Sequence, residues 1–206
     1  MRVAVVGGTG SFGLALAKRL RQAGYDVVIG SRDESRAREA AEVLGTDGAT
    51  NADAVATADL VVLATKAEGA VETARELRAA IGGTPVLSVA SELRFTPGGV
   101  LPTSEATSIA ERIQNELGAP VIAGLHSLAA STLGRETAPD EDALVCGDDA
   151  DAKALVLELA ACVTAGRAVD AGPLASARAL EGMTAVIVNV NKRYRAHAGL
   201  RFTGIG

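Results

Sequence analysis

The chain has 206 residues, of which 48% are hydrophobic and 22% charged, and its formal net charge is −5. This composition is typical of a soluble globular protein with one large domain, and the mild acidity argues against nucleic acid as the main partner. No run of about 18 apolar residues occurs, and a strand is expected directly after Met1-Arg2. We therefore expect no membrane partner, no signal peptide and a cytoplasmic location.

The first strand, near residues 2–7, runs into a G-x-G-x-x-G turn whose glycines are Gly8, Gly10 and Gly13. Such glycines allow a tight turn, bring backbone N–H groups close to a pyrophosphate and let the next helix, near 11–23, pack on the strand. The pyrophosphate of a dinucleotide then lies at the helix N-terminus, where unpaired N–H groups and the helix dipole favour an anion. Many glycine-rich turns bind nothing, but the strand before this one and the helix after it favour a dinucleotide site.

A second strand, near 25–30, ends where an NAD-binding protein usually has an acid for the ribose 2′-hydroxyl. Ser31 and Arg32 occupy that place here, and Arg36 follows one turn into a helix near 33–44. A hydroxyl and two guanidinium groups suit a 2′-phosphate, which a carboxylate would repel. We therefore expect NADP(H) as the cofactor. The alternative is that both arginines only mark a solvated helix start.

The alternation of strands and helices continues, with strands expected near 59–64, 85–90, 119–123, 142–146 and 165–169 and helices near 67–81, 104–117 and 150–161. This pattern predicts an α/β fold with a Rossmann-like doubly wound, mostly parallel sheet and a small C-terminal helical portion. We expect an NADP-binding domain over 1–147 and the C-terminal portion over 148–206. Two segments interrupt the pattern: 91–103, which is a plain connection or a substrate loop, and 135–142, which we expect to be an exposed loop.

A long helix is expected after Pro173, because apolar residues then recur at spacings of three and four: Leu180, Met183, Ile187, Val190 and Tyr194. Further apolar residues on its other faces predict burial on several sides, so we expect the helix to pack on its own sheet and on a second copy in a homodimer. Four cations and no acid lie between 192 and 206: Lys192, Arg193, Arg195 and Arg201. They form either a solvated basic tail or a clamp for an anionic ligand.

The residues offer no acid–base pair for catalysis. Neither tyrosine begins a Tyr-x-x-x-Lys pair, and no Gly-x-Ser-x-Gly turn occurs, so we assign no catalytic residue. His126, at an expected strand end, has either a structural role or a place in the crevice. Lys66 and Glu68 either contact a ligand or lie at a solvated helix start. Cys146 and Cys162 lack the spacing of a metal site or a disulfide framework, and we expect both to be buried.

The missing acid–base pair bears on the type of reaction. Reduction of a carbonyl group creates an alkoxide and needs a proton donor. Transfer between two redox cofactors mainly needs two rings held at reacting distance. The sequence fits the second kind of reaction better.

The chain resembles the NADPH-dependent reductases of the deazaflavin coenzyme F-420 (F420) over nearly its whole length. The resemblance rests on the glycine-rich start, Ile29-Gly30-Ser31-Arg32, Leu125-His126, Cys146-Gly147-Asp148-Asp149, Asp170-Ala171-Gly172-Pro173-Leu174 with Arg178 and Glu181, and Gly199-Leu200-Arg201-Phe202. It implies a dimeric Rossmann protein in which the deazaflavin stacks on the nicotinamide. It also implies that a hydride passes directly between nicotinamide C4 and deazaflavin C5, without an essential side-chain acid or base.

The resemblance also implies site residues by position. Thr9, Gly10, Ser11 and Phe12 are expected at the pyrophosphate, and Ser31, Arg32 and Arg36 at the 2′-phosphate. Ala67, Val71 and Ala130 are expected near the rest of NADP. Ala198 is expected near the deazaflavin. The chain departs from the family pattern at three expected crevice positions: Thr65-Lys66-Ala67, Ala129 and Ser91-Glu92-Leu93-Arg94. These departures concern the second substrate more than NADP(H).

Two other functions stay open. A β-hydroxyacid dehydrogenase or imine reductase has faint support from Asn189 and Lys192 on one helix, although the chain looks short for the large helical domain of such enzymes. A non-catalytic NADPH-binding sensor is the other. The physiological direction of transfer and the length of F420 tail accepted also stay open.

Overall fold

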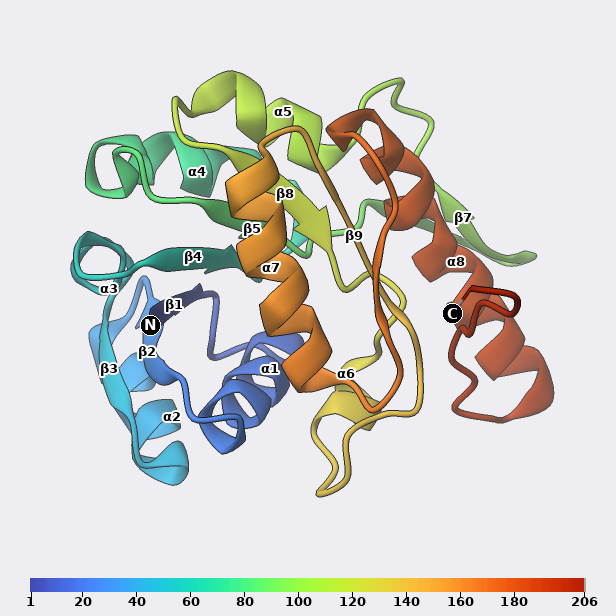
Figure 1. Ribbon diagram of the computed structural model, residues 1–206, viewed down its shortest axis with the longest axis horizontal. Helices are drawn as coiled ribbons and strands as arrows, with labels where there is room; N and C mark the ends of the chain where they lie inside the picture. Colours follow the sequence, from blue (N-terminus) through green and yellow to red (C-terminus); the bar gives the residue numbers. More distant parts are fainter. Residues whose placement is uncertain (206) are drawn as a thin grey trace.

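The computed structural model describes residues 1–205 and contains an eight-stranded sheet flanked by helices (Figure 1). The strands of this sheet are β1 (Arg2–Val6), β2 (Asp26–Ser31), β3 (Asp47–Thr50), β4 (Leu60–Leu63), β5 (Val86–Ser88), β8 (Val121–Gly124), β9 (Ala143–Gly147) and β10 (Ala168–Asp170). A separate hairpin pairs β6 (Leu93–Thr96) with β7 (Gly99–Pro102). The helices are α1 (Ser11–Gln22), α2 (Glu34–Leu44), α3 (Asn51–Ala56), α4 (Ala67–Ile81), α5 (Ile109–Glu116), α6 (Ala130–Leu133), α7 (Ala150–Val163) and α8 (Ala177–Tyr194).

The strand order β10-β9-β8-β5-β4-β1-β2-β3 confirms the expected Rossmann-like doubly wound sheet. Six strands, β3 to β8 in that order, are parallel; β9 pairs antiparallel with β8, and β10 pairs parallel with β9. The chain order reverses between β1 and β4, and ligands bind at such a switch point, beyond the carboxyl ends of the strands. Figure 1 shows α8 and β7 on the side toward which the arrows of β4 and β8 point.

Each strand of the sheet centre is apolar on both faces because helices cover both. Side chains alternate along a strand, so Ala4 and Val6 pack in one core with α4 and α5, while Val3 and Val5 pack in the other with α1, α2 and α7. This two-sided burial explains the continuous apolar runs of β1 and β4. It also fixes the strand ends at which the loops gather.

Five elements escaped the sequence prediction: β3, the hairpin strands β6 and β7, and the short helices α3 and α6. The strand β3 has the sequence Asp-Gly-Ala-Thr, which contains no apolar run, because it is the edge strand and is only half-buried. The segment 91–103 contains the β6–β7 hairpin rather than an irregular loop. Its turn is Pro97-Gly98, and Gly99, the first residue of β7, has φ +133°, a value that favours glycine.

Three further expectations were wrong in detail. The helix expected over 104–117 begins only at Ile109, because Ser108 forms a capping box: its Oγ accepts from the Glu111 N–H and the Glu111 carboxylate accepts from the Ser108 N–H. Cys162 is exposed, unlike the buried Cys146, because it lies on the outer face of α7. The segment 135–142 is not wholly exposed, since Glu141 and Asp142 are buried.

The helix α8 starts at Ala177, after Pro173 and a short 3-10 turn at Leu174–Ser176, and only its first half is buried as expected. The buried carboxylate of Glu181 accepts hydrogen bonds from the first N–H groups of α5, those of Ile109 and Ala110, both at 3.1 Å. Burial raises the pKa of Glu181 to about 7, although these two N–H groups oppose the shift. The second half of α8 leaves apolar side chains half-exposed, because the other elements reach only one side of it.

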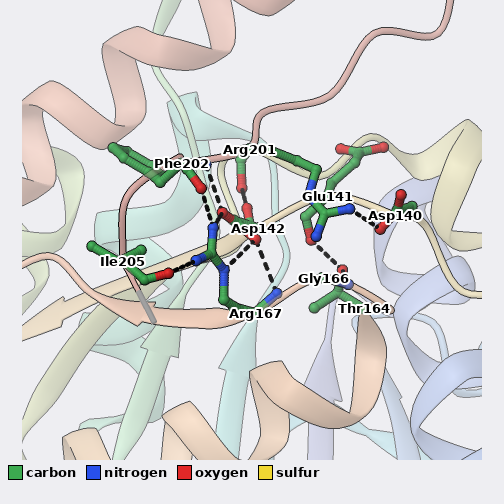
Figure 2. A network of polar contacts seen from close by, with 10 residues as sticks. Asp140, Glu141, Asp142, Thr164, Gly166, Arg167, Arg201, Phe202 and Ile205 are labelled. Carbon is green, nitrogen blue, oxygen red and sulfur yellow. Dashed lines mark hydrogen bonds and ion pairs between the residues drawn. The ribbon is translucent and has the colours of Figure 1, made fainter.

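The C-terminal segment is held to the sheet by one buried carboxylate (Figure 2). Asp142, fully buried, accepts from Arg167 Nη2 at 2.7 Å and from the Phe202 N–H at 2.7 Å. Its own N–H donates to the Leu200 carbonyl oxygen at 2.7 Å, and Arg167 also donates to the Ile205 carbonyl oxygen at 2.5 Å. The Arg167 guanidinium and the Phe202 N–H hold the pKa of the Asp142 carboxyl far below its usual range.

Among residues 1–205, no helix is both long and apolar enough to cross a membrane. Within the same residues, no three His, Cys, Asp or Glu side chains gather closely enough to hold a metal ion.

Candidate functional site

The glycine-rich turn after β1 is built so closely that side chains are excluded. Gly7 has φ +78°, and a Cβ there would lie 2.8 Å from the Ala64 carbonyl oxygen. A Cβ at Gly13 would lie 2.7 Å from the Gly7 carbonyl oxygen. Gly10 precedes α1, and no side chain of residues 1–205 caps the first N–H groups of this helix. The helix start therefore presents backbone donors to an anion such as a pyrophosphate.

Replacing Gly13 with alanine is expected to weaken NADPH binding at least tenfold, because the new Cβ contacts backbone atoms that can move only by distorting the turn. A fluorescence titration with NADPH measures the change. The matched control is Gly118→Ala, before β8, which lines neither cavity and where an added Cβ would meet no atom within 4 Å, so its affinity should be unchanged. Wild-type affinity in Gly13→Ala would contradict the proposed place of the pyrophosphate.

The end of β2 brings Ser31, Arg32 and Arg36 to one side of the same crevice. Neither arginine forms an ion pair within residues 1–205, whereas Arg38, two residues further along α2, pairs with Glu34 at 2.6 Å. The nearby acid Asp33 caps α2, and its Oδ1 accepts from the Arg36 N–H at 3.3 Å. Since this carboxylate is engaged by backbone N–H groups, the two guanidinium groups remain available for a phosphate.

These residues line a cavity of about 780 Å³, within the size range of small-molecule sites. It extends from Arg32 and Arg36, past the glycine turn, to the β4–α4 connection. Two lining residues carry a buried oxygen atom that lacks a hydrogen-bond partner within residues 1–205, Asn51 Oδ1 and Thr65 Oγ1. Unsatisfied buried oxygens are expected where a polar ligand completes the site, so the residues present fit a dinucleotide.

A second cavity, of about 710 Å³, adjoins the first. Both cavities are lined by Ala64, Thr65, Lys66 and Glu68, so the β4–α4 connection is a shared wall. The rest of the second cavity comes from segments far apart in the sequence: Phe12, 89–95, 103–105, Leu125, His126, Leu128 and Thr184. Two ligands bound in these cavities would therefore lie side by side.

His126 lines the second cavity but cannot act there as an acid. Its Nε2 lies 3.2 Å from the Ala90 carbonyl oxygen. Because a carbonyl oxygen only accepts, we assign the proton to Nε2, which leaves Nδ1 as a buried acceptor without a partner in residues 1–205. Burial lowers the pKa of His126 to about 4, so the ring is neutral near pH 7. The residue combines the two roles weighed from the sequence, since it is buried and also faces the crevice.

The structure brings most, but not all, of the expected site residues into these two cavities. Thr9, Gly10, Ser31, Arg32 and Arg36 line the first, and Phe12 and Ala67 line the second. The remaining expected residues line neither cavity and stay predictions: Gly8, Ser11, Gly13, Val71, Ala130 and Ala198. Sequence reasoning missed Asn51, although Thr50 and Asp53 around it have the spacing of a helix start.

Comparison with known proteins agrees with this geometry. Residues 2–92 match the family described as NADP oxidoreductase coenzyme F420-dependent. The chain is 36% identical over 222 residues to the F420-dependent NADP reductase of Methanothermobacter thermautotrophicus, covering 100% of this chain and 96% of the relative. It is similar to the crystal structure of a proposed F420-dependent NADP-reductase from Arthrobacter sp. FB24, with a TM-score of 0.85, 27% identity and coverage of 99% of this chain and 100% of that one.

An imine reductase from Bacillus cereus shares the fold at a TM-score of 0.60, but it is only 20% identical and the chain covers 60% of it. That likeness concerns the fold alone. The 36% identity over the whole chain is specific to one family. The protein therefore belongs to the family of coenzyme F420-dependent NADP oxidoreductases.

Proposed function

We propose that this protein transfers a hydride directly between NADP(H) in the first cavity and coenzyme F420 in the second. The observation that carries the proposal is that the two cavities adjoin at the β4–α4 connection, where Ala64, Thr65, Lys66 and Glu68 line both. Because the same residues border both cavities, ligands in the two cavities meet along this boundary, where their rings can approach to reacting distance, the main requirement of hydride exchange between redox cofactors.

When bound, NADP(H) and F420 would supply the chemistry, the exchange of one hydride between their rings balanced by one proton exchanged between the deazaflavin and solvent. The protein binds and orients. The start of α1 holds the pyrophosphate, and Arg32 and Arg36 hold the 2′-phosphate. Phe12, Leu125 and Leu128 exclude water from the second cavity, and neutral His126 offers Nδ1 as an acceptor to a ring N–H or amide. None of these residues has to move a proton at the reacting carbons.

The test is to mix the protein with NADPH and oxidised F420 and follow the visible absorbance of the oxidised deazaflavin. Loss of this absorbance with matching loss of NADPH is the expected result. If NADPH binds tightly while F420 stays oxidised, the protein is a sensor instead. If NADPH is consumed with an imine or a keto acid but not with F420, the protein is an imine reductase or a β-hydroxyacid dehydrogenase.

We further propose that the protein is a homodimer through the exposed half of α8 and the neighbouring hairpin. Apolar side chains are unusually open there: Val186 is 59% exposed, Tyr194 71% and Phe95 77%. Large exposed apolar side chains on two packed elements, α8 and the hairpin, favour a protein contact on this side. Both elements lie next to the second cavity, so the partner would border the F420 site.

Val186→Glu is expected to halve the mass measured by light scattering, because a charge in an apolar contact is left without a partner. Val43→Glu is the matched control: Val43 is 82% exposed on α2, at the opposite end of the sheet, and its replacement should leave the mass unchanged. A wild-type protein that is monomeric at micromolar concentration would contradict the dimer but not the reaction.

A further inference from the structure

The second cavity contains an arginine for which the proposed reaction has no use. Arg94, on β6, lines this cavity and not the first. It lies in Ser91-Glu92-Leu93-Arg94, which leads from the end of β5 into the β6–β7 hairpin. An arginine at the edge of a ligand cavity has two ordinary explanations, an ion pair with a neighbouring acid or the binding of an anion.

The first explanation does not hold within residues 1–205. The acid nearest in sequence, Glu92, is paired with Arg112 at 2.8 Å. Arg94 forms no ion pair there, and its contact is from Nε to the Pro102 carbonyl oxygen at 3.4 Å. This contact orients the guanidinium group while leaving both terminal nitrogens free to bind a ligand.

The position of Arg94 is fixed by α8. Asn189 on that helix receives a hydrogen bond from the Val100 N–H at 2.8 Å and donates one to the Val100 carbonyl oxygen at 2.6 Å. Val100 lies on β7, and the next residue of this strand, Leu101, pairs with Arg94 of β6. These contacts anchor the backbone of the hairpin beside the second cavity, so only the exposed side chain of Arg94 has to be ordered when it binds an anion.

The other charged side chains that line the second cavity are Lys66, Glu68, Glu105 and Glu92, the last of which is paired with Arg112. Lys66 lines both cavities and forms no ion pair within residues 1–205. Glu68, in the first turn of α4, and Glu105 also line the second cavity, so this cavity is not uniformly positive. Because the cavity carries both signs of charge, an anion is favoured only beside Arg94 or Lys66. Arg94 would therefore bind an anion by direct contact and not through a positive potential of the whole cavity.

We propose that Arg94 is a specificity-determining residue that binds the anionic side chain of the deazaflavin substrate, through its phosphate or its carboxylates. The proposal rests on the proposed function, because it takes the second cavity as the F420 site. It assigns to the β6–β7 hairpin the discrimination between the complete coenzyme and a deazaflavin without the charged tail. Lys66, on the shared wall, contacts both ligands.

The test compares F420 with its riboflavin-level fragment, which has the same ring but no phosphate and no glutamate. Arg94→Met is expected to raise KM for F420 about fivefold with kcat unchanged, as for loss of one partly exposed charged contact, and to leave KM for the fragment unchanged. Arg94→Lys should restore part of the loss. Lys66→Met should weaken both F420 and NADPH.

Arg21→Met is the matched control. Arg21 is likewise exposed and donates to a backbone carbonyl, that of Gly45 at 2.9 Å, but it lines neither cavity, so both KM values should stay at wild-type level. Equal losses for F420 and the fragment would overturn the proposal by placing Arg94 at the ring, and no loss for F420 would overturn it as well. Failure of the wild-type protein to reduce F420 would instead refute the proposed function.

Discussion

Replacing Arg32 and Arg36 together with alanine is expected to weaken NADPH binding about a hundredfold while leaving NADH binding nearly unchanged. Each guanidinium group is available to make a charge-assisted contact with the 2′-phosphate, and one such contact is worth about 1.5 kcal/mol or roughly tenfold. NADH has a hydroxyl group in place of this phosphate. The preference for NADPH over NADH should therefore fall by the same factor as the NADPH affinity.

Fluorescence titrations of both reduced dinucleotides measure this change. Arg38→Ala is the matched control, since it removes another α2 arginine that pairs with Glu34 and does not line the cavity. It should leave both affinities unchanged. Equal weakening of NADPH and NADH by the double variant would show that the arginines support the helix and do not read the phosphate.

Asp142→Asn is expected to destabilise the fold by about 2 kcal/mol, which lowers Tm by roughly 4–8 °C for a chain of this size. Both oxygens of this buried carboxylate accept N–H groups, from Arg167 and from the Phe202 backbone. An amide in its place turns one acceptor into a donor that faces other donors. The C-terminal segment drawn in Figure 2 then loses its main attachment.

The effect of this substitution depends on pH. Because contacts with Arg167 and Phe202 keep the folded pKa of Asp142 below its unfolded value, the carboxylate contributes all its stability above about pH 4. This contribution is lost as the pH falls further toward the folded pKa. The difference in Tm between the wild type and Asp142→Asn should thus be constant from about pH 5 to 8 and shrink in stronger acid.

Differential scanning calorimetry across this pH range provides the measurement. Asp140→Asn is the matched control: Asp140 also attaches the C-terminal segment, through Arg201 at 2.6 Å, but its side chain is 69% exposed. An exposed pair contributes little, so Tm should change by less than about 2 °C. A Tm difference for Asp142→Asn that grows below about pH 4 would contradict the assigned ionisation.

The sequence predicted those parts of the site that depend on neighbouring residues. The glycine turn, the start of α1 and the pair Arg32 and Arg36 all lie in the first two strand–helix units, and each follows a strand whose apolar run is buried on both faces. Residues that follow such a strand lie at the edge of the sheet where ligands bind, so their place in the sequence predicts their place in the fold. The doubly wound, mostly parallel character of the sheet could be predicted from the alternation of strands and helices, although the order of its strands was not.

The second cavity could not be predicted in this way, because its walls meet only through tertiary packing. Arg94 reaches the cavity on a hairpin whose strands have four residues each and whose support, Asn189, lies far along the chain on α8. Asn51 follows an edge strand without an apolar run. The burial of Asp142 likewise depends on contacts with residues 167 and 202, which no local pattern of the 135–142 segment contains.

Direct transfer between the two bound rings is tested most closely with NADPH that carries deuterium at both positions of nicotinamide C4. In ordinary water, direct transfer predicts one deuterium per molecule at C5 of reduced F420, detected by mass spectrometry or proton NMR. Reduced F420 that contains only protium from solvent at C5 would contradict it.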